Sequence, residues 1–158
     1  MGARRIMVFG AGSRLAGDEA AGIAVVEELA AQELPEGVSV HEIGTDGYAL
    51  LSELAEDVDL AIVVDCAKMG LAPGTVAVFG PDEVEDMKPS RGLSLHSLNL
   101  LETIKAAQVI NPKSRFRIVG IEPERVELLE SLSDTVARAI PQAVERVKAE
   151  IERAIRGD

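Results

Sequence analysis

Residues 60–64 are the part of the sequence that most restricts how this chain can fold. All five are apolar, and the run leads directly into Asp65. A strand made only of apolar residues is typical of a parallel sheet that helices cover on both faces. The run therefore predicts a buried central strand and a protein of the α/β class.

The rest of the chain alternates strand-like and helix-like segments around this run. Short apolar or alternating runs predict four more strands, at residues 4–9, 38–43, 75–79 and 115–121. Helical spacing of apolar residues predicts helices at 18–32, 47–55, 97–109 and 133–155, with a kink or break expected at Pro141. The segment 75–79 alternates least clearly and suits a sheet edge. This order predicts an α/β sandwich with a mostly parallel sheet, and 158 residues suit one domain spanning residues 1–158.

Charge and composition exclude several classes of partner. The chain has 27 acidic against 16 basic residues, a net charge of −11, so its surface repels nucleic-acid phosphates and anionic membranes. One cysteine and two histidines cannot complete a closed structural zinc site, so a metal site here must use carboxylates. No apolar run approaches the roughly 20 residues of a membrane span, and no signal peptide is evident. We expect a cytoplasmic protein that binds neither nucleic acid nor membrane.

The glycine-rich loop after the first predicted strand allows two interpretations. Gly10-Ala11-Gly12 is similar to the start of a dinucleotide-binding loop, and Glu42 ends the next strand like an acid that binds ribose. However, Leu15 stands in the place of the third glycine. Asp18 and Glu19 occupy the helical turn where a pyrophosphate would bind, and two carboxylates would repel it. We therefore expect no nucleotide, with a nucleotide-binding module kept as an alternative.

Acids at strand ends and one histidine predict a cleft that binds a cation. An acid after the first strand, Asp65 after the central strand and His96 at a helix entry would meet at the carboxyl ends of the strands. Oxygen and nitrogen donors of this kind suit a divalent metal with open positions for substrate. The alternatives are helix capping by Asp18 and Glu19 and a solvent-facing or capping His96.

Two other residues with reactive side chains are weaker candidates. Cys66 is adjacent to Asp65 and is more typical of a small buried residue than of a nucleophile. His41 falls inside a predicted strand beside Glu42. Neither histidine accompanies a nucleophile motif such as Gly-x-Ser-x-Gly, so the sequence does not favour a serine or cysteine protease.

A series of motifs extends over nearly the whole chain. They are residues 8–22, 44–47 with Leu50-Leu51, 64–67, 73–75, 94–96, and 120–124 with Leu132-Ser133. In this order they resemble the hydrogenase maturation proteases. Members of that family are endopeptidases that trim the C-terminus of the large-subunit precursor of nickel-iron hydrogenases.

The resemblance implies a fold, a site and a partner. The implied fold is a three-layer sandwich with a twisted five-stranded sheet between helices. The implied catalytic and metal-contacting residues are Glu19, Asp65 and His96. The implied partner is the hydrogenase large-subunit precursor, which is cleaved only after nickel insertion, so the nickel comes with the substrate and no tightly bound metal of the enzyme's own is expected. A non-catalytic chaperone that senses metal in the precursor is the remaining alternative.

Three positions depart from the family pattern. Ser13 stands where the family usually has Asn, and Ala21 where it often has Gly or a larger residue. Glu42 stands where the family often has Asp. Because Glu42 is expected near the cleft, we predict that it contributes to recognition of the precursor, with Asp18 as a second candidate for this role.

Overall fold

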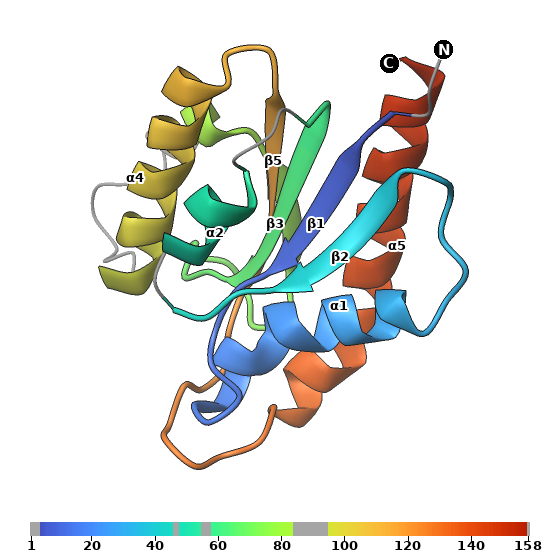
Figure 1. Ribbon diagram of the computed structural model, residues 1–158. Helices are drawn as coiled ribbons and strands as arrows, with labels where there is room; N and C mark the ends of the chain where they lie inside the picture. The colour runs from blue at the N-terminus through green and yellow to red at the C-terminus, as the bar shows by residue number, and fades with distance from the viewer. Residues whose placement is uncertain (1–3, 46–47, 55–57, 84–94, 158) are drawn as a thin grey trace.

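The computed structural model describes residues 4–45, 48–54, 58–83 and 95–157, and not the side chains of residues 48 and 95–99 (Figure 1). Its strands are β1 (Ile6–Gly10), β2 (Val38–Glu42), β3 (Leu60–Cys66), β4 (Val76–Phe79) and β5 (Arg115–Ile121). They form one sheet in the order β2-β1-β3-β5-β4, and only β4 runs antiparallel to its neighbour. Both the mostly parallel five-stranded sheet and the edge position of β4 are confirmed.

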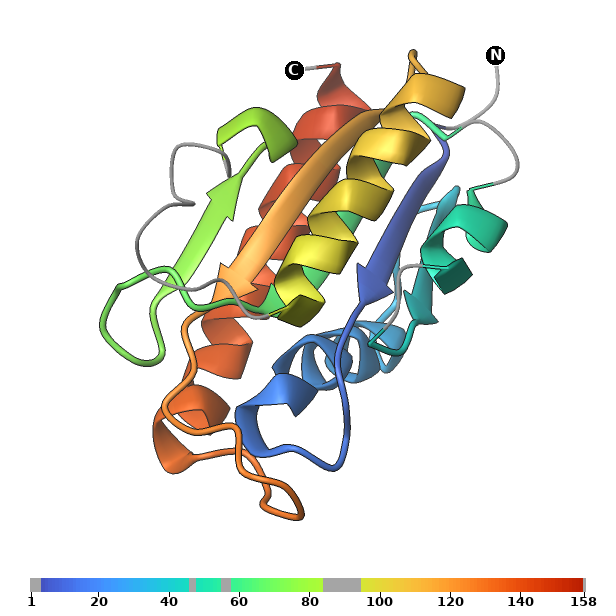
Figure 2. The same ribbon diagram turned by 90° about the vertical axis from the view of Figure 1, so that its left-hand side faces the viewer.

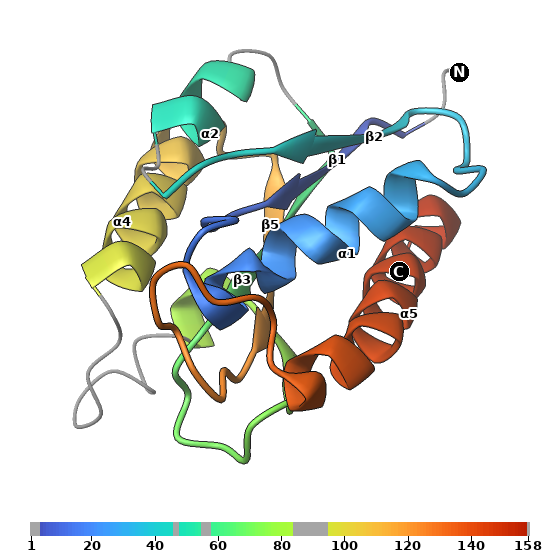
Figure 3. The ribbon, with the colours of Figure 1, turned by 90° about the horizontal axis from the view of Figure 1, so that it is seen from below.

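Helices cover both faces of this sheet. They are α1 (Ala21–Ala30), α2 (Tyr48–Glu53), α4 (Leu95–Ile110) and α5 (Asp134–Arg156), with a 3-10 helix η1 (Gly17–Ala20) before α1. Figures 1 and 3 show α1 and α5 on one face and α2 and α4 on the other. Alternate residues of β1 supply the two apolar cores, Ile6 and Val8 facing α1 and α5, Met7 and Phe9 facing α2 and α4. The predicted three-layer sandwich is confirmed.

Three local predictions need correction. The helix expected over 18–32 is divided into η1 and α1 and ends at Ala30. The central strand is longer than residues 60–64, so Asp65 lies within β3 instead of after it. The break expected at Pro141 is wrong, because α5 continues through it. One missing backbone donor costs less than the buried apolar face of α5 contributes.

Parallel pairing brings the functional ends of the strands together. The C-terminal ends of β1, β2, β3 and β5 point the same way, toward the lower end of Figure 2. The loops 11–16 and 122–133 lie beyond them, and α4 begins at the same end. We call this end of the molecule the carboxyl edge. In the described part of the chain, no helix is both long and apolar enough to cross a membrane.

Candidate active site

Gly12 lies close to both of the predicted catalytic acids that the structure describes. A Cβ added to Gly12 would stand 1.9 Å from the carbonyl oxygen of Glu19 and 4.0 Å from Oδ1 of Asp65. The loop is closed by hydrogen bonds from the Gly12 amide to the Gly44 carbonyl (3.4 Å) and from the Ser13 amide to the Glu19 carbonyl (3.2 Å). With φ at +134°, position 12 suits only glycine. The glycine loop therefore holds the Glu19 backbone close to Asp65.

A second glycine seats the start of α1 against the sheet. A Cβ on Gly22 would stand 2.3 Å from the carbonyl oxygen of Val64 and 2.5 Å from that of Ala11. Only a residue without a side chain allows this approach of helix to strand backbone. Since Glu19 lies one helical turn before Gly22, this packing also sets the position of Glu19 at the carboxyl edge.

Asp65 is buried at the end of the central strand. The residue is only 2 % exposed. Strand alternation places its side chain on the same face as Ala61 and Val63, which pack toward α2 and α4. Helix α4 begins at Leu95 on that face, so the backbone of His96 lies on the same side of the sheet as the Asp65 side chain.

The predicted third donor cannot be judged from side-chain geometry. The side chain of His96 lies outside the described residues. Among the side chains that are described, no group of three His, Cys, Asp or Glu is placed to hold a metal ion. The set Glu19, Asp65 and His96 therefore stays a prediction, supported by where the backbone brings the three residues.

Asp18 has a position that the sequence did not indicate. It is fully buried, and its carboxylate accepts hydrogen bonds from the amides of Glu124 (2.8 Å), Arg125 (2.9 Å) and Ser133 (2.7 Å) and from the Ser133 hydroxyl (2.9 Å). Burial alone would raise the pKa of Asp18, but these hydrogen bonds outweigh it and lower the pKa below its ordinary value. Asp18 thus anchors the loop 122–133, and a carboxylate without exposed surface does not fit the predicted contact with substrate.

The Asp18→Asn variant is expected to lose about 2 kcal/mol of unfolding free energy at pH 7, because an amide cannot accept all these hydrogen bonds. The pKa of the native carboxylate is below the unfolded value of about 3.9, so its contribution is complete above that pH and is lost as the pH falls toward the native pKa. Urea unfolding at pH 7 and near pH 3 should show a difference in unfolding free energy between the native protein and the Asp18→Asn variant, and this difference should be smaller near pH 3. Glu28→Gln, on the exposed face of α1, is the control, and a difference independent of pH would contradict the assignment.

Cys66 is not available as a nucleophile. The residue is 7 % exposed. Burial raises the pKa of its thiol far above the ordinary range, and the negative charges of Asp65 and Glu19 add to the shift, followed by those of Asp18 and Glu122. A thiol that stays protonated at neutral pH is inert. The interpretation of Cys66 as a small buried residue is confirmed, and the four carboxylates make the carboxyl edge strongly negative.

His41 belongs to a different part of the sheet. Its ring stacks on Phe9 at 5.3 Å, its Nε2 lies 2.8 Å from the Ser39 hydroxyl, and its Nδ1 lies 3.8 Å from a carboxylate oxygen of Glu53. These contacts occupy the ring on the α2 side of β2. That His41 takes no part in the site stays a prediction.

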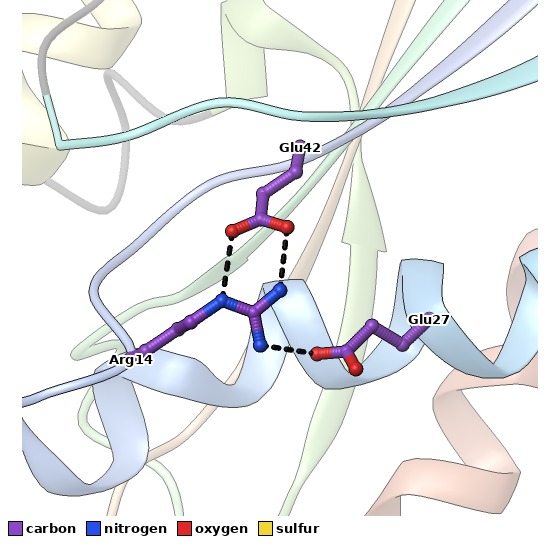
Figure 4. A network of polar contacts seen from close by, with 3 residues as sticks. All are labelled: Arg14, Glu27 and Glu42. Atoms are coloured by element: carbon purple, nitrogen blue, oxygen red, sulfur yellow. Dashed lines mark hydrogen bonds and ion pairs between the residues drawn. The ribbon is translucent and has the colours of Figure 1, made fainter.

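A groove of about 720 Å³ lies at the carboxyl edge beside the glycine loop. Its lining consists of Gly12, Ser13, Arg14, Leu15, Ile23, Glu42, Ile43 and Gly44. Figure 4 shows that Arg14 makes two bonds with Glu42, from Nε (3.0 Å) and Nη2 (2.6 Å), and one from Nη1 to Glu27 (2.7 Å). Glu42 lines this groove as the partner of an arginine, and its role in recognising the precursor stays a prediction.

Arg14 is a candidate functional residue that the sequence alone did not reveal. Its partners are 13 and 28 positions away along the chain, so no local motif joins them. A bidentate arginine–carboxylate pair fixes the direction of both side chains. The pair therefore places one positive and one negative side chain, Arg14 and Glu42, on the groove wall, and Glu27 of α1 bonds Arg14 from behind.

Fold and site together define an α/β enzyme with buried acids at the carboxyl edge of its sheet and an open groove beside them. Residues 23–150 match the hydrogenase maturation protease family. The chain is 33 % identical over 153 residues to the hydrogenase 2 maturation protease of Escherichia coli K12, covering 95 % of this chain and 92 % of that protein. It is 31 % identical over 152 residues to the hydrogenase expression/formation protein HupD of Rhodobacter capsulatus, covering 92 % and 72 %.

Solved structures agree with these sequence comparisons. The hydrogenase maturating endopeptidase HybD from Escherichia coli superposes with a TM-score of 0.82 and 33 % identity, covering 95 % of this chain and 93 % of that one. The NiFe hydrogenase maturation protease HybD from Thermococcus kodakarensis gives 0.76 and 25 %, covering 92 % and 97 %. The chain belongs to the hydrogenase maturation protease family and is an endopeptidase.

Proposed function

We propose that this endopeptidase removes the C-terminal extension of a nickel-iron hydrogenase large-subunit precursor after nickel has been inserted. The observation that carries the proposal is the position of Gly12, which lies close to both the Glu19 backbone and the Asp65 carboxylate and lines an open groove. The family membership gives the hydrogenase as partner, and the name of the Thermococcus kodakarensis protein specifies the nickel-iron type for that relative. The single cysteine, free and buried, suits a reducing compartment, and we propose a cytoplasmic location.

Glu19, Asp65 and His96 are the residues proposed to complete the coordination of nickel in the substrate. Two oxygen donors and one nitrogen donor suit a borderline divalent ion. A nickel ion that belongs to the precursor would orient the precursor at the carboxyl edge and polarise either the scissile carbonyl or an attacking water. The enzyme itself would then need no tightly bound metal.

Glu42 and Arg14 are proposed to select which precursor enters the groove. Both line it, and their side chains are held in fixed directions by the bonds described above. A precursor segment that reaches Asp65 along this groove would pass both groups. Membership of a protease family supports the endopeptidase over the nucleotide-binding alternative.

The proposal predicts that cleavage depends on nickel in the precursor. The purified protein is incubated with nickel-loaded and with nickel-free precursor, and mass spectrometry follows the loss of the C-terminal extension. We expect a shortened product only from the nickel-loaded form. Equal cleavage of both forms would refute nickel dependence, and a stable complex without any shortened product would favour a metal-sensing chaperone.

A further inference from the structure

Three exposed leucines lie together at the carboxyl edge. Leu15, Leu128 and Leu129 are 60 %, 72 % and 80 % exposed. The Leu129 amide donates a hydrogen bond to the Leu15 carbonyl (2.5 Å), which joins the loop after β1 to the loop 122–133. Figures 1 and 2 show these two loops side by side beyond the ends of the strands. We call these three residues the leucine tip.

The backbone at Leu129 has a conformation that is unfavourable for leucine. Its φ of 65° makes it the one non-glycine residue with a left-handed backbone in the described part of the chain. A leucine there is unfavourable because its Cβ approaches the following carbonyl. Burial of the side chain does not compensate, since Leu129 is 80 % exposed. Strain of this kind persists where surrounding structure enforces it and is concentrated at functional sites.

The enforcing structure is the buried anchor of the loop. Asp18 binds the loop at Glu124, Arg125 and Ser133, on both sides of the leucines. The Gly17 amide also donates to the Glu130 carbonyl at 3.0 Å. The loop therefore presents Leu128 and Leu129 outward from a rigid base.

The leucine tip is continuous with the groove of the candidate active site. Leu15 is part of the leucine tip and also lines the groove beside Gly12. Specific protein contacts bury about 800 Å² on each partner. A folded protein substrate that places a segment in the groove would therefore extend over neighbouring surface, and the leucine tip is the apolar part of it. The carboxylates of the carboxyl edge can make only polar contacts with a partner, so an apolar contact beside the groove comes from the leucine tip.

We propose that the leucine tip is a docking surface for an apolar patch of the hydrogenase precursor, which it holds while the segment to be cut lies in the groove. This inference rests on the proposed function. Because the contact is apolar, it should depend little on salt, unlike contacts made by the acidic groups of the edge. The loop that Asp18 anchors holds Leu129 exposed in the free enzyme.

The test uses Leu128→Ser/Leu129→Asn, with Val109→Ser/Ile110→Ser as the matched control. Asn tolerates a left-handed backbone, so the first variant should unfold at the same temperature as the native protein or a higher one. Val109 and Ile110 are 82 % and 67 % exposed at the far end of α4. Affinity is measured in the native background with nickel-free precursor, which the proposed function leaves uncut, at low and high salt. kcat and KM are measured with nickel-loaded precursor.

We expect the leucine variant to lose about tenfold or more in affinity, with a matching rise in KM, an unchanged kcat and no effect in the control. Unchanged affinity of the leucine variant for the precursor would contradict the docking proposal. If that variant still cleaves the precursor, the proposed function stands. Leucine-dependent binding without any cleavage would support the surface and overturn the proposed function. A native dimer that the leucine variant converts to a monomer would overturn the proposal by assigning the tip to a second copy of the chain.

Discussion

Asp65→Asn is expected to lower kcat/KM for precursor processing by more than about 100-fold. Loss of a residue that merely supports a metal ligand costs 10- to 100-fold, and loss of the ligand itself should cost more. The substitution keeps the shape of the side chain and removes its charge. Asp65 is 2 % exposed at the end of the central strand, so its carboxylate has a fixed position there.

The measurement is a time course of precursor shortening, with circular dichroism to verify the fold. Glu152→Gln removes one charge from the exposed face of α5, far along the chain from the site, and should process at the native rate. Glu19→Gln tests the second acid in the same assay and should show a comparable loss. Native activity in the Asp65 variant would remove that residue from the catalytic set.

Gly12→Ala is expected to destabilise the fold by about 2–5 kcal/mol and to abolish most processing. The new Cβ would stand 1.9 Å from the Glu19 carbonyl oxygen, so the backbone that carries Glu19 must move. Overpacking of this kind costs about 1–3 kcal/mol, and a left-handed conformation costs about 1–2 kcal/mol more for alanine than for glycine.

Gly44→Ala is the matched control, because a Cβ there meets nothing within 4 Å and its backbone needs no positive φ. Its unfolding free energy, measured in urea, should stay within about 0.5 kcal/mol of the native value. If Gly12→Ala were as stable as the control and processed precursor normally, the glycine loop would not be what positions Glu19.

The sequence predicted the layers of the fold because buried positions in strands and helices show as hydrophobic periodicity. An apolar run at residues 60–64 indicated a strand covered on both faces, and β3 is buried throughout. The edge at 75–79 was also predictable, since its alternation was the weakest. The split of the helix over 18–32 was not predictable. It depends on contacts of Asp18 with residues more than 100 positions away.

The sequence predicted similar roles for the adjacent acids Asp18 and Glu19, but the structure places their side chains in different surroundings. Asp18 and Glu19 are neighbours in the 3-10 turn η1, yet Asp18 is buried in hydrogen bonds with the loop 122–133 and Glu19 is partly exposed beside Gly12. Position at a strand end identified the region, and the resemblance to the family singled out Glu19. Only the closure of the loop onto η1 separates the two side chains.

By itself, the sequence determined the α/β class, the central strand and the carboxyl edge of the sheet. Those features follow from hydrophobic periodicity, which each segment carries locally. The tertiary structure alone decided the anchor role of Asp18, the Arg14–Glu42 pair and the exposure of the leucine tip. These depend on hydrogen bonds and ion pairs between distant segments, and such bonds exist only once the loops have closed over the sheet.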